Sequence, residues 1–153
     1  MEKVILARYK QSDFTVSYEN KRYVWAGSKG DIVSKKAIPV EAYEWLASQT
    51  STLKDGELVL DKSNENIEEL KENIYEIEEY EVNSLSKEEI KKLLEGNIKK
   101  MKAELEKIEV ETTKSFIMSV AREIKLESSA KQKFLKEWLG TELTIEELFP
   151  VEE

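Results

Sequence analysis

The residues that most often carry enzyme chemistry are missing from this chain, which has no histidine and no cysteine among its 153 residues. Their absence removes the usual general base, the Ser–His and Cys–His nucleophile pairs, thiolate metal ligands and disulfides. The sequence also contains no phosphate-binding loop, calcium-binding loop, GxSxG or HExxH motif. We therefore expect a protein that is not an enzyme, with no catalytic residues, no cofactor and no metal.

Four aromatic residues in two neighbouring runs could stack on nucleic-acid bases: Phe14, Tyr18, Tyr23 and Trp25. Proteins that bind single strands combine such stacking with a basic groove. Residues 1–62 carry ten basic and nine acidic residues, so a groove here would be weakly charged. Packing in a core or at a sheet edge is the alternative, and at least one aromatic set must be core. Tyr23 and Trp25 are kept as candidate interaction residues.

Lys99, Lys100 and Lys102 form the densest basic cluster of the chain. Glutamates follow within one or two turns of the same predicted helix, which favours Lys–Glu pairing along that helix. A patch that contacts phosphates usually has positive potential over a wider surface. Contact with DNA and intrahelical pairing both remain open for this cluster.

The elements that must position these residues begin with a small β module over residues 1–62. Apolar and alternating runs predict the strands, and two such runs around an Asn-containing turn predict a hairpin. The expected elements are a strand at 3–9, hairpin strands at 14–18 and 21–27, a short strand around Ile32–Val33, a helix at 40–49 and a strand at 57–61.

Most of the net charge of −8 lies in residues 63–83, which carry one lysine and eight glutamates. Ile67, Leu70, Ile74 and Ile77 are spaced 3, 4 and 3 residues apart, so they share one face of a helix. We predict a single acidic helix that connects two modules and docks by this apolar face.

Residues 84–153 predict a helical bundle. Three sites have the capping-box pattern, in which Ser or Thr is followed three residues later by Glu or Gln; they start at Ser86, Ser129 and Thr144. Gly96–Asn97 breaks or caps the first helix. The predicted fold class is thus α+β, with a β module, an acidic connecting helix and a C-terminal bundle. Candidate apolar anchors for protein contacts are Phe116, Phe134, Trp138 and Phe149.

Residues 85–108 (LSKEEIKKLLEGNIKKMKAELEKI) resemble the helix–extended loop–helix modules related to SAP and LEM domains. Those modules read LS-x-x-EI-x-x-LL, then a glycine, then a lysine-rich helix with a K-x-EL ending. The loop is several residues shorter here, so one longer helix with a kink at Gly96 is an alternative. The resemblance implies contact with DNA. The matching residues are Ser86, Glu89, Ile90, Leu93, Leu94, Gly96, Lys102, Glu104 and Leu105.

The N-terminal half resembles the small β module of YqbF-type phage and prophage proteins. In that module a short hairpin, an Ala-Gly turn and a V-P-x-x-x-Y-E-Y-L-like helix precede a helical segment. The matching residues are Tyr23, Ala26, Gly27, Val33, Pro39, Tyr43, Glu44 and Leu46. This resemblance implies a protein encoded among virion head and neck genes, without enzymatic activity.

Together these features favour a non-enzymatic phage or prophage structural protein that acts through assembly contacts in a capsid, neck or tail. Its partners would be other virion proteins or further copies of itself. The alternatives are a small acidic inhibitor of a nucleic-acid enzyme, whose glutamates imitate a phosphate backbone, and a DNA-contacting adaptor that uses residues 85–108.

The expected location is the host cytoplasm during assembly and then the virion. The apolar run near the N-terminus is shorter than a signal peptide requires, and no run approaches the roughly 20 apolar residues that span a bilayer. We therefore expect no membrane partner and no secretion by a signal peptide.

Overall fold

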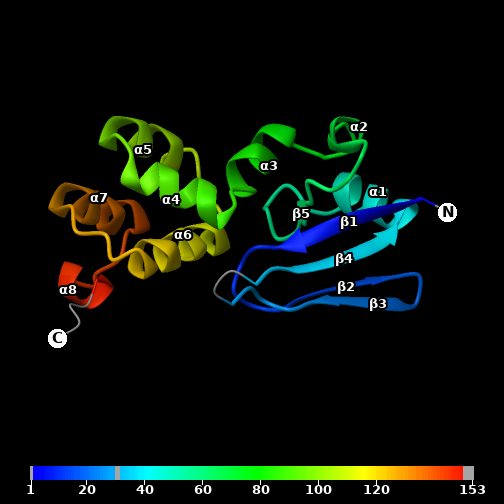
Figure 1. Ribbon diagram of the computed structural model, residues 1–153, viewed down its shortest axis with the longest axis horizontal. Helices are drawn as coiled ribbons and strands as arrows, with labels where there is room; N and C mark the ends of the chain where they lie inside the picture. The colour runs from blue at the N-terminus through cyan, green and yellow to red at the C-terminus, as the bar shows by residue number, and fades with distance from the viewer. Residues whose placement is uncertain (1, 30–31, 150–153) are drawn as a thin grey trace. The chain divides into compact units, whose positions relative to one another are not determined.

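The computed structural model describes residues 2–29 and 32–149 (Figure 1). Its contacts cluster into two compact units, Met1–Leu85 and Ser86–Glu153, here called the N-terminal unit and the C-terminal unit. The N-terminal unit combines strands and helices, whereas the described residues of the C-terminal unit form helices only. The predicted α+β class is confirmed.

A three-stranded antiparallel sheet and a separate hairpin form the frame of the N-terminal unit. Strand β1 lies at the centre of the sheet, in the order β4-β1-β5, and β2 pairs with β3. Both hairpin-turn residues, Glu19 and Asn20, have positive φ, as a two-residue type I′ turn requires. The predicted hairpin is confirmed. The elements are β1 (Lys3–Arg8), β2 (Phe14–Tyr18), β3 (Lys21–Trp25), β4 (Ser34–Pro39), α1 (Val40–Gln49), β5 (Val59–Leu60), α2 (Ile67–Lys71) and α3 (Ile77–Asn83).

The strand expected around Ile32–Val33 begins later and is longer. Strand β4 runs from Ser34 to Pro39 and pairs with β1 along its whole length. Ile32 forms only an isolated bridge with Lys29. The sequence pattern did not predict the full length of β4, because an edge strand tolerates two lysines and a terminal proline.

Residues 63–83 do not form a single connecting helix, so that prediction was wrong. They form the two short helices α2 and α3, and Glu76 between them has a left-handed backbone conformation with φ 57°. The backbone N–H of Tyr75 donates to the carbonyl oxygen of Ala47 at 2.8 Å, outside any helix of its own segment. This contact with α1 interrupts the helical path.

The apolar stripe of the acidic segment is nevertheless buried, as its spacing predicted. Leu70 and Ile74 are 3% and 6% exposed and belong to the core of the N-terminal unit, with Ile67 and Ile77 packed against it. The Tyr43 hydroxyl donates to the carbonyl oxygen of Leu70 at 2.6 Å. The acidic segment is therefore an integral layer of the N-terminal unit.

The C-terminal unit contains five helices in its described residues: α4 (Lys87–Glu95), α5 (Ile98–Leu105), α6 (Glu111–Glu123), α7 (Ser129–Leu139) and α8 (Ile145–Leu148). Capping boxes form at Ser86 and Thr144, as predicted. The expected box at Ser129 is displaced, because the neighbouring Ser128 caps α7 and accepts from the N–H of Lys131. Along the described chain, no helix is long and apolar enough to cross a bilayer.

Helices α4 and α5 are joined by only two residues, Gly96 and Asn97. The Asn97 side chain accepts a hydrogen bond from the N–H of Lys99 at 2.7 Å and so caps α5. The segment 85–108 therefore has neither the extended loop of the SAP and LEM modules nor one kinked helix.

Candidate interaction surface

The aromatic residues Tyr23 and Trp25 lie in the core of the N-terminal unit. Trp25 is fully buried and its indole N–H donates to the carbonyl oxygen of Leu6 at 3.0 Å, while Tyr23 is 7% exposed. The inner face of the hairpin packs against the rest of the unit, so these rings form no stacking platform. The prediction that Tyr23 and Trp25 are interaction residues was therefore wrong, and the alternative, packing in a core, is correct.

The lysine cluster lies on the exposed side of α5. Lys99, Lys100 and Lys102 are exposed, and none of them forms an ion pair with any residue in the described ranges. Lys102 places its Nζ 5.6 Å from the centre of the Phe134 ring. The predicted pairing of these lysines with the glutamates that follow is therefore not seen in the described residues; Glu104 instead pairs with Lys107, which lies just beyond the end of α5, at 3.5 Å.

Two of the four candidate apolar anchors are internal. Phe116 and Phe149 are 7% and 9% exposed, so they pack inside the C-terminal unit and are corrected as surface anchors. Phe134 and Trp138 on α7 are half-buried. The Trp138 indole N–H donates to the carbonyl oxygen of Leu105 at 2.8 Å, which caps the end of α5.

An exposed tryptophan that sequence reasoning did not select lies beside half-buried Tyr18 on the N-terminal unit. Trp45 on α1 is 38% exposed, and its ring centre lies 5.4 Å from that of Tyr18, with the planes tilted by 41°. Trp45 shares the exposed side of α1 with Glu41 and Ser48, at positions i−4 and i+3. A tryptophan within the polar stripe of an amphipathic helix was the signal that could have revealed it.

Three carboxylates act electrostatically on the Tyr18 member of this pair. Partial desolvation raises the pKa of the Tyr18 hydroxyl above its ordinary value, and the negative charges of Glu19, Glu41 and Glu44 raise it further. None of these three glutamates forms an ion pair within the described parts of the chain. We call this set the aromatic–acidic surface; it comprises Tyr18, Glu19, Glu41, Glu44 and Trp45.

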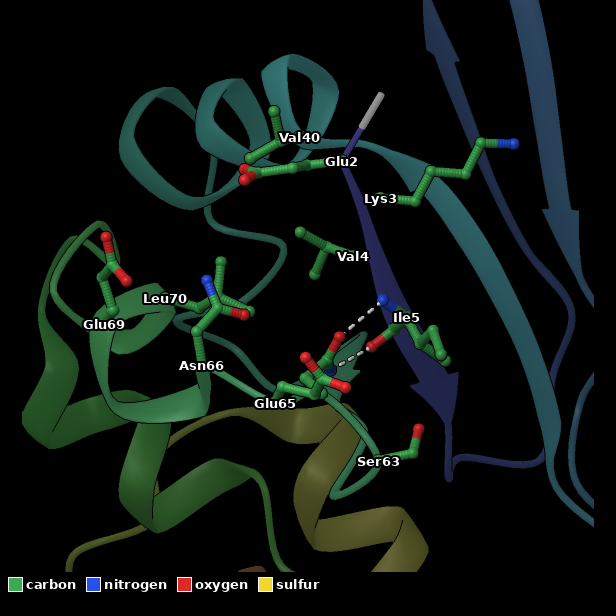
Figure 2. Close-up of a pocket in the computed structure, with 11 residues that line it drawn as sticks. Glu2, Lys3, Val4, Ile5, Val40, Ser63, Glu65, Asn66, Glu69 and Leu70 are labelled. Carbon is green, nitrogen blue, oxygen red and sulfur yellow. Dashed lines mark hydrogen bonds between the residues drawn. The ribbon is translucent and has the colours of Figure 1, made fainter.

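A pocket of about 460 Å³ lies between the start of β1, the start of α1 and residues 63–70 (Figure 2). At one end, the Asn64 side chain forms the two hydrogen bonds with β1 that a neighbouring strand would otherwise form. Its Nδ2 donates to the carbonyl oxygen of Ile5 at 2.8 Å, and its Oδ1 accepts from the Ile5 N–H at 2.9 Å. Glu2, Glu65 and Glu69 line the pocket, yet no group of three or more acidic residues in the described chain could hold a metal.

A buried ionic cluster ties the end of β1 to the chain before β5. Arg8 and Lys10 are only 2% and 3% exposed. A single Glu57 oxygen accepts from Arg8 Nη1 at 3.0 Å and from Lys10 Nζ at 3.3 Å. Burial lowers the pKa of Lys10, and the charge of Glu57 opposes that shift. Since the described partners are internal to the N-terminal unit, the cluster supports the fold rather than a binding site.

Comparison with known proteins agrees with the division into two units. Residues 2–76 match the YonA N-terminal domain, and residues 86–145 match the YonA C-terminal domain. The division after Leu85 lies between the two matches. No curated protein and no solved structure matches the chain. The chain is thus similar, in sequence order, to both domains of the YonA family.

Proposed function

We propose that this protein is a non-enzymatic structural protein of a phage or prophage, which acts through protein–protein contacts in a capsid, neck or tail. The observation that carries the proposal is the exposed Trp45, whose ring is held against Tyr18 on the outer side of α1. Tryptophan is enriched among the few residues that dominate protein interfaces. A large ring that stays in water at a fixed position is suited to such a contact.

The family match and the likeness to YqbF-type proteins support the phage or prophage origin. YonA is a family of phage type, and both of its domains occur here in sequence order. Under this proposal the protein is made in the host cytoplasm and then enters the virion. Its partners are other virion proteins or further copies of itself.

The test is co-sedimentation with particles that form in a host carrying the gene. We expect the wild-type protein to sediment with particles or with a particle substructure, and Trp45→Ala to remain in the soluble fraction. Tyr75→Ala is the matched control, because Tyr75 is also an exposed aromatic residue of the N-terminal unit, at 56%. If the wild-type protein is absent from particles at every stage of assembly, the proposal is wrong.

A second candidate function is inhibition of a nucleic-acid enzyme by an acidic surface. The observation that favours it is that all eight glutamates of residues 63–83 are exposed. Such an inhibitor would bind its target in a strongly salt-dependent manner. It would also lose affinity when four of these glutamates are neutralised, namely Glu68, Glu72, Glu76 and Glu79. An assembly protein would be little affected by those changes.

The third candidate, a DNA-contacting adaptor, depends on the exposed lysines of α5. Lys99, Lys100 and Lys102 could each reach a phosphate, since no described glutamate pairs with them. Retention of the protein on immobilised duplex DNA at low salt is the test. A protein that passes through without retardation would exclude this function.

A further inference from the structure

We propose that the aromatic–acidic surface binds an arginine-bearing segment of a partner protein. In this contact the guanidinium group lies on the Trp45 ring, and its N–H groups donate to the carboxylates of Glu41 and Glu44. The inference rests on the proposed assembly function, for which it names the chemistry of the partner.

The geometry of α1 places a carboxylate beside an open ring. Glu41 and Trp45 are separated by one helical turn, so their side chains are neighbours on the helix surface. Contact with Tyr18 orients the indole, whose ring centre lies 5.4 Å from that of the tyrosine. Because Trp45 remains 38% exposed, a planar group can still reach part of the ring.

The charge around Trp45 favours a cationic partner. Glu19, Glu41 and Glu44 all act on the neighbouring Tyr18 hydroxyl, and none is neutralised by an ion pair in the described chain. Lys21, which lies opposite Tyr18 in the hairpin, directs its Nζ to the Tyr23 ring at 5.5 Å. Residues 1–85 as a whole carry 17 acidic and 11 basic residues.

Trp45 has no cation over its ring, unlike three other aromatic residues that are exposed or half-buried. Lys54 lies 5.8 Å from the centre of exposed Tyr75, Lys102 lies near Phe134, and Lys114 lies near Trp138. No lysine or arginine of the described residues lies over Trp45 in this way. We infer that the cation at this ring comes from the partner.

Arginine fits the surface better than lysine does. The guanidinium group is planar and weakly hydrated, so it can stack on an indole while its N–H groups still reach carboxylates. Hydrogen bonds from arginine to carboxylates can also be bidentate, which fixes the orientation of the partner. Lysine offers a compact, strongly hydrated ammonium that matches only the charge.

The experiment titrates the full-length, ¹⁵N-labelled protein with acetyl-Arg-Arg-amide and, separately, with acetyl-Lys-Lys-amide at low salt. The three tryptophan indole N–H signals report Trp25, Trp45 and Trp138, and Trp45→Phe identifies the signal of Trp45. We expect a saturable shift of that signal with the arginine peptide and clearly weaker binding of the lysine peptide. The buried Trp25 signal should not move.

Matched charge changes separate the proposed contact from general attraction. Glu41→Gln with Glu44→Gln should weaken binding of the arginine peptide about fivefold, as expected for loss of two partly exposed ion pairs. Glu68→Gln with Glu72→Gln removes the same charge from the acidic segment and should leave binding nearly unchanged. Equal losses in the two double variants, or no saturable shift at Trp45, would overturn the inference.

The particle experiment distinguishes failure of this inference from failure of the proposed function. If Trp45→Ala prevents co-sedimentation while Glu41→Gln with Glu44→Gln does not, the assembly function stands and the arginine contact is refuted. The surface would belong to a second copy of the chain if the protein self-associates with rising concentration and Trp45→Ala abolishes that association. That result would also overturn the inference.

Discussion

The two units start their helices in different ways. In the N-terminal unit, α1, α2 and α3 all begin without a hydrogen bond from a capping side chain. In the C-terminal unit, four of the five described helices begin with a Ser, Thr or Asn side chain that accepts from a backbone N–H. Such caps depend only on residues within one turn of the helix start.

The N-terminal unit relies instead on hydrogen bonds between residues far apart in the sequence. Tyr43 donates to Leu70, the N–H of Leu60 donates to the Tyr80 hydroxyl at 3.0 Å, and Asn64 pairs with Ile5. All six tyrosines of the chain lie in this unit. The difference teaches that helix starts are specified largely by local signals in one unit and by contacts that exist only after folding in the other.

The largest expected effect comes from two glycines that share a backbone conformation but differ in surroundings. Gly56 and Gly140 have φ of 70° and 67°. A Cβ on Gly56 would lie 2.1 Å from the carbonyl oxygen of Asn83, whereas a Cβ on Gly140 would meet nothing within 4 Å. Gly56→Ala should therefore destabilise the N-terminal unit by about 4 kcal/mol, and Gly140→Ala should cost the C-terminal unit about 1 kcal/mol.

Amide hydrogen exchange, followed separately in peptides from the two units, measures both changes. Gly56→Ala should accelerate exchange in the slowest peptides of residues 2–85. If the two glycine variants have equal effects, the close approach of Asn83 to Gly56 does not limit stability.

An intermediate effect is expected at high pH, where the tyrosines lose their protons. Burial raises the pKa of Tyr80 to about 12, and burial also raises the pKa of Tyr43. Because these pKa values are higher in the folded state, the associated stability is present below about pH 10 and is lost as pH rises toward 12. Tyr80 alone should account for a loss of about 2 kcal/mol by pH 12.

Comparison of the wild type with Tyr80→Phe isolates the contribution of Tyr80 to the pH dependence of stability. The variant should be less stable at neutral pH, since the buried N–H of Leu60 loses its acceptor. Its stability should then fall less steeply above pH 10, so the two stability curves converge. Denaturant unfolding at a series of pH values measures this, and parallel curves would show that Tyr80 does not titrate as described.

The smallest effect concerns the caps of the C-terminal unit. Ser86→Ala removes a cap whose Oγ accepts from the N–H of Glu89 at 3.2 Å, and should cost about 1 kcal/mol. Ser129→Ala is the control, because Ser128 rather than Ser129 caps α7. Thermal unfolding followed by the C-terminal unit's single tryptophan, Trp138, reports both variants. A loss at Ser129 equal to that at Ser86 would contradict the observed cap.

The success of the sequence predictions follows the same division between local and long-range signals. The hairpin, α1, the Ser86 and Thr144 capping boxes and the buried Leu70–Ile74 stripe all depend on short-range patterns, and all are confirmed. The strand β4 was misplaced because an edge strand needs no apolar alternation. The break between α2 and α3 was missed because its cause, the contact of Tyr75 with Ala47, joins separate elements.

For the candidate site, too, the sequence could predict local features but not contacts between separate elements. Residue type and spacing could place Trp45 within a polar stripe on α1, but could not show that Tyr18 from a different element lies against it. Nor could they decide between core and surface for Trp25 and Phe116, which only packing resolves.

The sequence by itself determined the fold class, the helix starts at Ser86 and Thr144 and the absence of histidine and cysteine chemistry. Each of these depends on composition or on residues within a few positions of one another. Only the tertiary structure decided that the acidic segment belongs to the N-terminal unit and that one tryptophan stays in water among carboxylates. Both outcomes depend on which distant side chains compete for the same buried space, and local spacing does not encode that competition.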